Sequence, residues 1–124
     1  FDDNSVDALT ISFGLRNVSD IPKGLSEFYR VLKPGGQFLC LEFSEVQHKS
    51  VNVAYKFYSQ NVITRLGNYI VPQVGSPPYE YLVDSIQRFP NQPTLQSMIE
   101  LAGFKTVTYT NLTDGIVAIH EGWK

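Results

Sequence analysis

The chain has 124 residues, of which 43% are hydrophobic and 18% charged, and its formal net charge is −2. The length suits one domain with a hydrophobic core. The hydrophobic fraction excludes a disordered chain, and the nearly balanced charge excludes a nucleic-acid-binding patch. No stretch approaches the roughly 20 apolar residues that a membrane-spanning helix needs. The single cysteine, Cys40, lies in an apolar run, so we predict a small core residue rather than a disulfide or a zinc ligand.

The first 43 residues predict a strand, a helix and a second strand. Residues 6–13 form a mostly apolar segment of strand length. Ser19 and Asp20 offer capping oxygens for a helix, whose apolar residues recur at helical spacing until Pro34-Gly35-Gly36. Residues 37–43 are an almost continuous apolar run, which is typical of a strand buried on both faces of a parallel sheet.

The middle of the chain differs from this pattern. An apolar stripe at intervals of three or four residues predicts an amphipathic helix over residues 51–70, and residues 79–89 predict a shorter one. Together they make a helical insert at about 45–92, longer than usual connections. We expect this insert to cover a pocket.

The end of the chain predicts one helix and two strands. The helix is expected over residues 94–102, capped by Thr94, and the strands over 104–112 and 115–120. The Asp114-Gly115 step between the strands is a hairpin signal. The fold class is therefore α/β, with a sheet that finishes in an antiparallel hairpin.

A nucleotide-binding α/β fold normally has a glycine-rich turn after its first strand and an acidic residue about 20 positions later. Neither is present here, and Gly35-Gly36 follows a helix, at the opposite edge of the sheet. Because the chain also opens without an initiator methionine or a targeting segment, we interpret it as the second half of such a fold.

Several motifs resemble the UbiE-type ubiquinone/menaquinone-biosynthesis C-methyltransferase family. The resemblance extends over essentially all 124 residues and is slightly closer to the mitochondrial ubiquinone branch. The segments concerned are TISFGLRNV (10–18), YRVLKPGG (29–36), LEFS (41–44), YLVDSI (81–86) and NLTDGIVAIH (111–120).

This resemblance implies a class I S-adenosylmethionine-dependent methyltransferase with a Rossmann-like, seven-stranded sheet, of which this chain would supply strands four to seven. It implies C-methylation of a 2-methoxy-6-polyprenyl-1,4-benzoquinol, with S-adenosylmethionine as cosubstrate and no metal. The chain alone is expected to be inactive. Expected partners are a second copy and ubiquinone-biosynthesis complex subunits, with peripheral membrane contact and no nucleic acid. The expected location is the matrix side of the mitochondrial inner membrane, or the cytoplasm if the source is bacterial.

The resemblance also assigns candidate site residues. Arg16 follows the carboxyl end of the first strand, where active sites of open α/β sheets lie, and its fixed charge suits a phenolate. Asn17 would orient the reacting hydroxyl or a water, and Ser12 and Phe13 would contact the cosubstrate. Candidate quinol-binding residues are Tyr55, Tyr58 and Tyr79, because aromatic rings offer apolar area with a polar tip.

Other interpretations stay open. Arg16 and Asn17 could instead fix the loop by hydrogen bonds, and the tyrosines could be core residues. The chain could belong to a structural subunit of a quinone-biosynthesis assembly, to a demethylmenaquinol methyltransferase, or to a different α/β enzyme such as a nicotinamide dehydrogenase. Lys56 and Thr64 depart from the family pattern, in which an acid and a proline are usual, and both lie in the helical insert.

Overall fold

The computed structural model describes residues 1–57 and 84–124, without the side chains of 52, 55 and 56. The chain divides into two compact units, one made of residues 1–45 and 90–124 and the other of residues 46–89. Most of the predicted helix over 51–70 and the start of the one over 79–89 lie outside the described residues.

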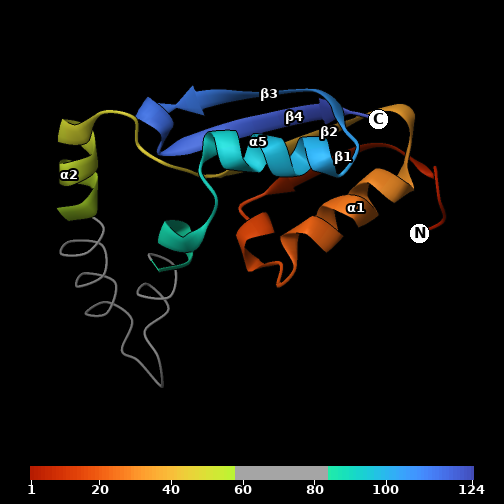
Figure 1. Ribbon diagram of the computed structural model, residues 1–124, viewed down its shortest axis with the longest axis horizontal. Helices are drawn as coiled ribbons and strands as arrows, with labels where there is room; N and C mark the ends of the chain where they lie inside the picture. Colours follow the sequence, from red (N-terminus) through yellow and green to blue (C-terminus); the bar gives the residue numbers. More distant parts are fainter. Residues whose placement is uncertain (58–83) are drawn as a thin grey trace. The chain divides into compact units, whose positions relative to one another are not determined.

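The first unit is built on a four-stranded sheet in the order β1-β2-β4-β3 (Figure 1). The strands are β1 (Val6–Ser12), β2 (Leu32–Phe43), β3 (Lys105–Leu112) and β4 (Val117–Trp123). β1 and β2 are parallel, whereas β4 runs antiparallel to both of its neighbours, β2 and β3. The predicted α/β sheet with a terminal antiparallel hairpin is confirmed.

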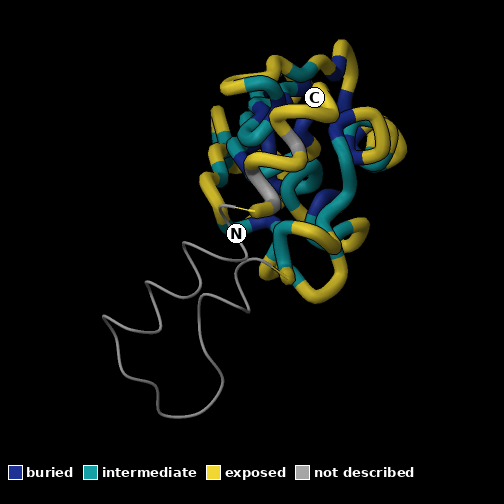
Figure 2. Tube along the Cα trace, turned by 90° about the vertical axis from the view of Figure 1, so that its left-hand side faces the viewer, coloured by how far each residue is buried: buried dark blue, intermediate teal, exposed yellow. Residues whose placement is uncertain are grey.

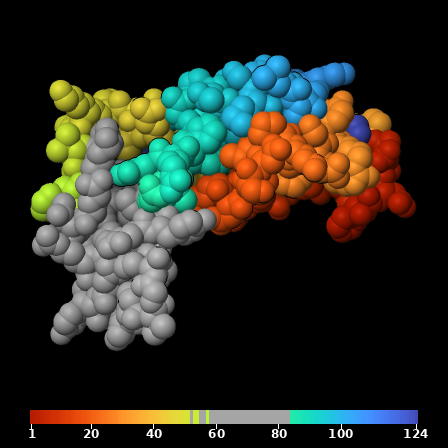
Figure 3. All heavy atoms as spheres, turned by 60° about the horizontal axis from the view of Figure 1, so that its bottom comes forward, coloured from red at the N-terminus to blue at the C-terminus, as the bar shows by residue number. Residues whose placement is uncertain are grey.

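Two helices, α1 (Ile21–Val31) and α5 (Gln92–Leu101), pack against each other and the sheet (Figures 1 and 3). The core lies beneath them, and Figure 2 shows the buried positions inside this unit. Phe38 is fully buried, with its ring 5.6 Å from that of Phe28 and 5.2 Å from that of Phe104. These aromatic contacts join α1, β2 and the start of β3 into one core.

Burial along β2 alternates, so the prediction of a strand buried on both faces is wrong for the described residues. Phe38, Cys40 and Glu42 are buried, whereas Leu39 and Leu41 are only half-buried. The physical reason is that α1 and α5 cover one face of the sheet. The second face has no described helix over it.

The helix boundaries also differ from the sequence pattern. α1 ends at Val31, before Pro34, because β2 already begins at Leu32. The Asp20 side chain caps α1 by accepting the Lys23 N–H at 3.1 Å, as predicted. The cap of α5 is Asn91, not Thr94: the Thr94 N–H donates to Asn91 Oδ1 at 3.1 Å.

The second unit is described only at its two ends. It contains α2 (Lys49–Phe57), and residues 84–88 are also helical. Among the described helices, none is long and apolar enough to cross a membrane.

Candidate active site

The candidate site lies at the edge of the sheet where the parallel strands β1 and β2 both end. Ser12 is the last residue of β1 and pairs with Leu41, two residues before the end of β2. The chain then turns through the short 3-10 helix η1 (Leu15–Asn17), which is held in the core by the fully buried Leu15. Open α/β sheets bind ligands at this carboxyl edge.

Phe13 has an unusual backbone conformation at the start of this turn. Its φ is 54°, in the left-handed region that costs a non-glycine residue of order 1 kcal/mol or more. Two hydrogen bonds maintain it: the Phe13 N–H donates to Leu41 O at 2.8 Å, and Phe13 O accepts from Arg16 Nη1 at 2.8 Å. The Phe13 ring remains 37% exposed and lies 4.9 Å from the Phe43 ring.

Arg16 forms an ion pair with Glu42 of β2, in which Nη1 lies 2.8 Å from Oε1. The Glu42 side chain is 2% exposed and that of Arg16 is 11% exposed. Glu42 also accepts the backbone N–H of Arg16 at 3.3 Å and that of Phe43 at 3.1 Å. Since a buried carboxylate is costly unless it is paired and hydrogen-bonded, these donors explain how Glu42 is tolerated there.

The rest of the Arg16 guanidinium is less fully engaged. Its central carbon lies 5.5 Å from the centre of the Phe43 ring, within the range of a cation–π contact. Its Nε is buried and has no hydrogen-bond acceptor among the described residues. Buried donors without acceptors are rare in folded proteins and call for an explanation.

The remaining residues predicted near Arg16 are exposed. Ser12 and Asn17 both lie at the surface, and the Asn17 backbone N–H donates to Gly14 O at 3.1 Å within the turn. Ser12, Phe13, Arg16 and Asn17 therefore lie on one short segment at one edge of the sheet. Their predicted chemical roles stay predictions.

The structure describes no side chain for the three predicted quinol-binding tyrosines. Tyr55 belongs to α2, but its side chain is not described, and Tyr58 and Tyr79 lie outside the described residues. Their role in the substrate pocket stays a prediction.

Cys40, predicted to be a core residue, and His120 both lie in the interior. Cys40 is fully buried, and burial raises the pKa of its thiol to about 12, so it is unsuited to nucleophilic chemistry. His120 is also buried, with its Nε2 3.0 Å from Gln92 O. Burial lowers the pKa of His120, and this hydrogen bond partly opposes that shift.

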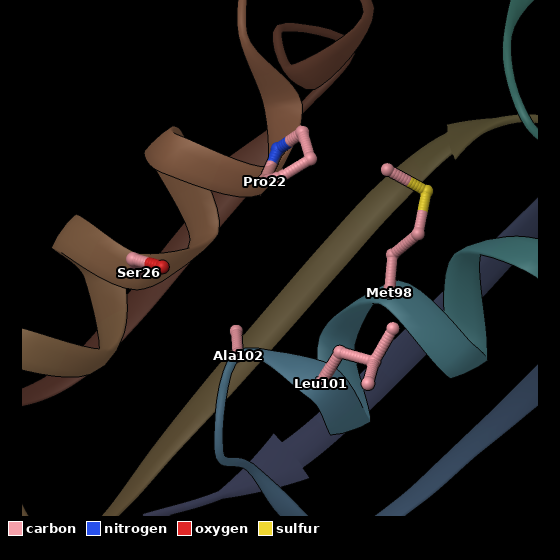
Figure 4. Close-up of a pocket in the computed structure, with 5 residues that line it drawn as sticks. All are labelled: Pro22, Ser26, Met98, Leu101 and Ala102. Carbon is pink, nitrogen blue, oxygen red and sulfur yellow. The ribbon is translucent and has the colours of Figure 1, made fainter.

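A small cavity of about 110 Å³ lies between α1 and α5 (Figure 4). Pro22 and Ser26 of α1 and Met98, Leu101 and Ala102 of α5 line it. It has no ionisable lining group and so offers no acid or base. Among the described residues, no cluster of three or more His, Cys, Asp or Glu side chains could hold a metal ion.

Glu42 was missed as a site residue, although a signal for it was present in the sequence. It is the one charged residue in the otherwise apolar segment 38–43. A charge at such a position needs a partner, and the nearest arginine by strand order is the one after β1. Phe43, whose ring contacts both Phe13 and Arg16, was missed as well.

The fold and the carboxyl-edge site define the class, a methyltransferase-like α/β protein. The chain superposes on a SAM-dependent methyltransferase from Thermotoga maritima with a TM-score of 0.64 at 19% identity, covering 99% of this chain and 58% of that one. It also superposes on a Haemonchus contortus phosphoethanolamine N-methyltransferase 2, solved with S-adenosyl-L-methionine. There the TM-score is 0.65 at 16% identity, covering 100% of this chain and 34% of that one.

The chain belongs to the ubiE/COQ5 methyltransferase family, whose model matches residues 1–124. It is 55% identical over 124 residues to the ubiquinone/menaquinone biosynthesis C-methyltransferase UbiE of Brucella canis, covering 100% of this chain and 45% of that protein. The UbiE of Brucella anthropi is also 55% identical, with 46% of its length covered. The chain thus spans about half the length of the curated relatives it matches.

Proposed function

We propose that the protein containing this chain methylates a ring carbon of a polyprenyl benzoquinol in ubiquinone biosynthesis, with S-adenosylmethionine as methyl donor. The observation that supports this most strongly is the guanidinium of Arg16, fixed at the carboxyl edge of the sheet in a chain of the ubiE/COQ5 family. The Brucella relatives are named for both ubiquinone and menaquinone biosynthesis, so a demethylmenaquinol is the second substrate to test.

The chemistry needs a nucleophilic carbon, which a quinol ring provides when its neighbouring hydroxyl loses a proton. S-Adenosylmethionine would supply an electrophilic methyl group: a carbon–carbon bond would form as the sulfur–methyl bond breaks, S-adenosylhomocysteine would leave, and the ring proton would pass to water. Arg16 would stabilise the developing oxyanion, since a fixed cation in a site of low polarity does this well. An arginine scarcely releases its proton, so the quinol proton passes to water, which Asn17 would orient.

Ser12 and Phe13 suit contacts with the cosubstrate. Ser12 is exposed at the end of β1, and the Phe13 ring is partly exposed beside it, so a polar group and an apolar surface adjoin at this edge. The glycine-rich turn of such folds is absent from these 124 residues, so most of the cosubstrate site must come from further sequence. We expect no measurable binding of S-adenosylmethionine by the chain alone.

The helical insert is proposed to cover the substrate. Tyr55, Tyr58 and Tyr79 would provide aromatic area for the quinol ring and prenyl tail. The boundaries of the second unit, 46–89, are compatible with such an insert at about 45–92.

We further propose the mitochondrial inner membrane, matrix side, as the location, with a second copy and quinone-biosynthesis subunits as partners. The resemblance of residues 38–44 and 115–120 to the mitochondrial branch supports this, whereas the relatives reported above are bacterial and favour the cytoplasm. Fractionation of cells of the source organism, followed by carbonate extraction of the membranes, distinguishes the two locations.

The test is a chimera in which this chain replaces the segment it matches in the Brucella canis relative. The purified chimera is given labelled S-adenosylmethionine with a polyprenyl benzoquinol or a demethylmenaquinol, and the products are identified by mass. Methylation of the benzoquinol ring carbon supports the proposal. A folded chimera that binds S-adenosylmethionine but methylates neither quinol contradicts it.

A further inference from the structure

Glu42 occupies a position that packing alone does not explain. It lies on the buried, helix-facing side of β2, in line with Phe38 and Cys40, and is 1% exposed. A leucine at this position would fill the same layer without the cost of removing a charge from water. A buried carboxylate at the carboxyl edge therefore suggests a task other than stability.

Its hydrogen bonds converge on one residue. Glu42 Oε1 accepts from Arg16 Nη1 at 2.8 Å, and Oε2 accepts the Arg16 backbone N–H at 3.3 Å. The carboxylate thus holds both the guanidinium and the main chain of the turn that also contains Asn17. A third donor, the Phe43 N–H at 3.1 Å, fixes the carboxylate itself.

These contacts leave a defined part of Arg16 for a ligand. The two Nη1 protons are used by Phe13 O and Glu42 Oε1. Nε, in contrast, is buried and has no acceptor within residues 1–57 and 84–124. Because Nε is covered, a ligand at this edge reaches the guanidinium through the 11% of the Arg16 side chain that stays exposed.

We propose that Glu42 is a positioning residue of the methyl-transfer site, which holds the Arg16 guanidinium at the carboxyl edge of the sheet so that its exposed part faces the oxyanion of the quinol. This inference rests on the proposed function. Glu42 acts through Arg16 and does not itself contact the substrate. The charge of Glu42 also keeps the Glu42–Arg16 ion pair neutral overall before the substrate oxygen loses its proton.

The test compares Glu42→Gln with Glu121→Gln in the chimera. Gln retains an acceptor for Nη1 but presents an amide N–H to the Arg16 backbone N–H, so the geometry of the turn is lost. We expect kcat to fall by about tenfold to a hundredfold, the cost of a small misplacement, while the Kd for S-adenosylmethionine changes less than about twofold. Glu121 lies on β4 and accepts hydrogen bonds from Gln37 and Thr108, so its variant should keep the parental kcat.

A double-mutant cycle separates positioning from a general effect on the fold. If Glu42 acts through Arg16, Glu42→Gln causes no further loss of kcat in an Arg16→Ala background. Additive losses, or a parental kcat in Glu42→Gln, overturn the inference. If Glu42→Gln does not fold, Glu42→Asp is the second variant, because it keeps the charge on a shorter side chain. We expect Glu42→Asp to show the same loss of kcat with an unchanged affinity for S-adenosylmethionine. Full activity of Glu42→Asp overturns the inference. A parental chimera without quinol methylation contradicts the proposed function instead.

Discussion

Replacing Gln92 tests how the start of α5 is attached to the sheet. Gln92 is 1% exposed, and its Nε2 donates to Glu45 O at 2.8 Å, to Asn111 Oδ1 at 3.0 Å and, more weakly, to Gly115 O at 3.5 Å. Leucine has a similar size but no donor, so Gln92→Leu leaves these acceptors unpaired. At about 1 kcal/mol for each of the two shorter bonds, and less for the third, we expect a loss of about 2–3 kcal/mol in the free energy of unfolding.

The matched control is Gln96→Leu on the same helix, which removes a single bond from Gln96 Nε2 to Val107 O at 2.8 Å. Its expected cost is about 1 kcal/mol. Urea unfolding can be followed by the fluorescence of the single tryptophan, Trp123, at low protein concentration. Equal midpoints for the two variants, or a Gln92→Leu midpoint at the parental value, would refute the reasoning.

Three further predictions concern the first unit. Gly103→Ala should lower the free energy of unfolding by about 1–3 kcal/mol, because Gly103 has a φ of 116° and an added Cβ would lie 3.0 Å from the Tyr29 ring. An unchanged urea midpoint would contradict this prediction. Burial lowers the pKa of His120 in the folded chain below the usual histidine value, so the unfolded chain takes up the extra proton first as the pH falls. The contribution of His120 to stability is therefore intact above about pH 6.5 and decreases as the pH falls below that value. His120→Asn should flatten that slope in urea titrations at several pH values, and an unaltered slope would contradict the assignment. β1 is an edge strand with an exposed Thr10, so the chain should self-associate at high micromolar concentration, as measured by sedimentation. Thr10→Lys should weaken this self-association. A monodisperse monomer of the parental chain would contradict the prediction.

The sheet could be predicted because its signals are local. The apolar run of β2, the Asp114-Gly115 step and the helical spacing in α1 each define an element from short-range sequence. The position of β4 between β2 and β3 was not predicted, since periodicity does not specify strand order. The cap of α5 was misassigned because Asn91 and Thr94 are both good caps, and geometry alone decides between them.

The site was predicted less completely. The turn from Ser12 to Asn17 could be located because it follows a strand. Its partner Glu42 was missed, because it lies 26 residues away from Arg16 in the sequence and its one signal is a lone charge in an apolar run. The left-handed conformation of Phe13 gave no sequence signal, since such a φ is unusual for an aromatic residue. Pairing of the parallel strands β1 and β2 is what brings Phe13, Arg16 and Glu42 together.

The central claim is that this chain contributes the oxyanion-stabilising cation of a quinol C-methyltransferase. Its most direct measurement is the rate of benzoquinol methylation by the chimera with Arg16, Arg16→Lys and Arg16→Ala. We predict that Arg16→Ala lowers kcat by about a hundredfold or more, that Arg16→Lys recovers only part of the loss, and that the affinity for S-adenosylmethionine stays at the parental value. A folded Arg16→Ala chimera that methylates the quinol at the parental rate would contradict the claim.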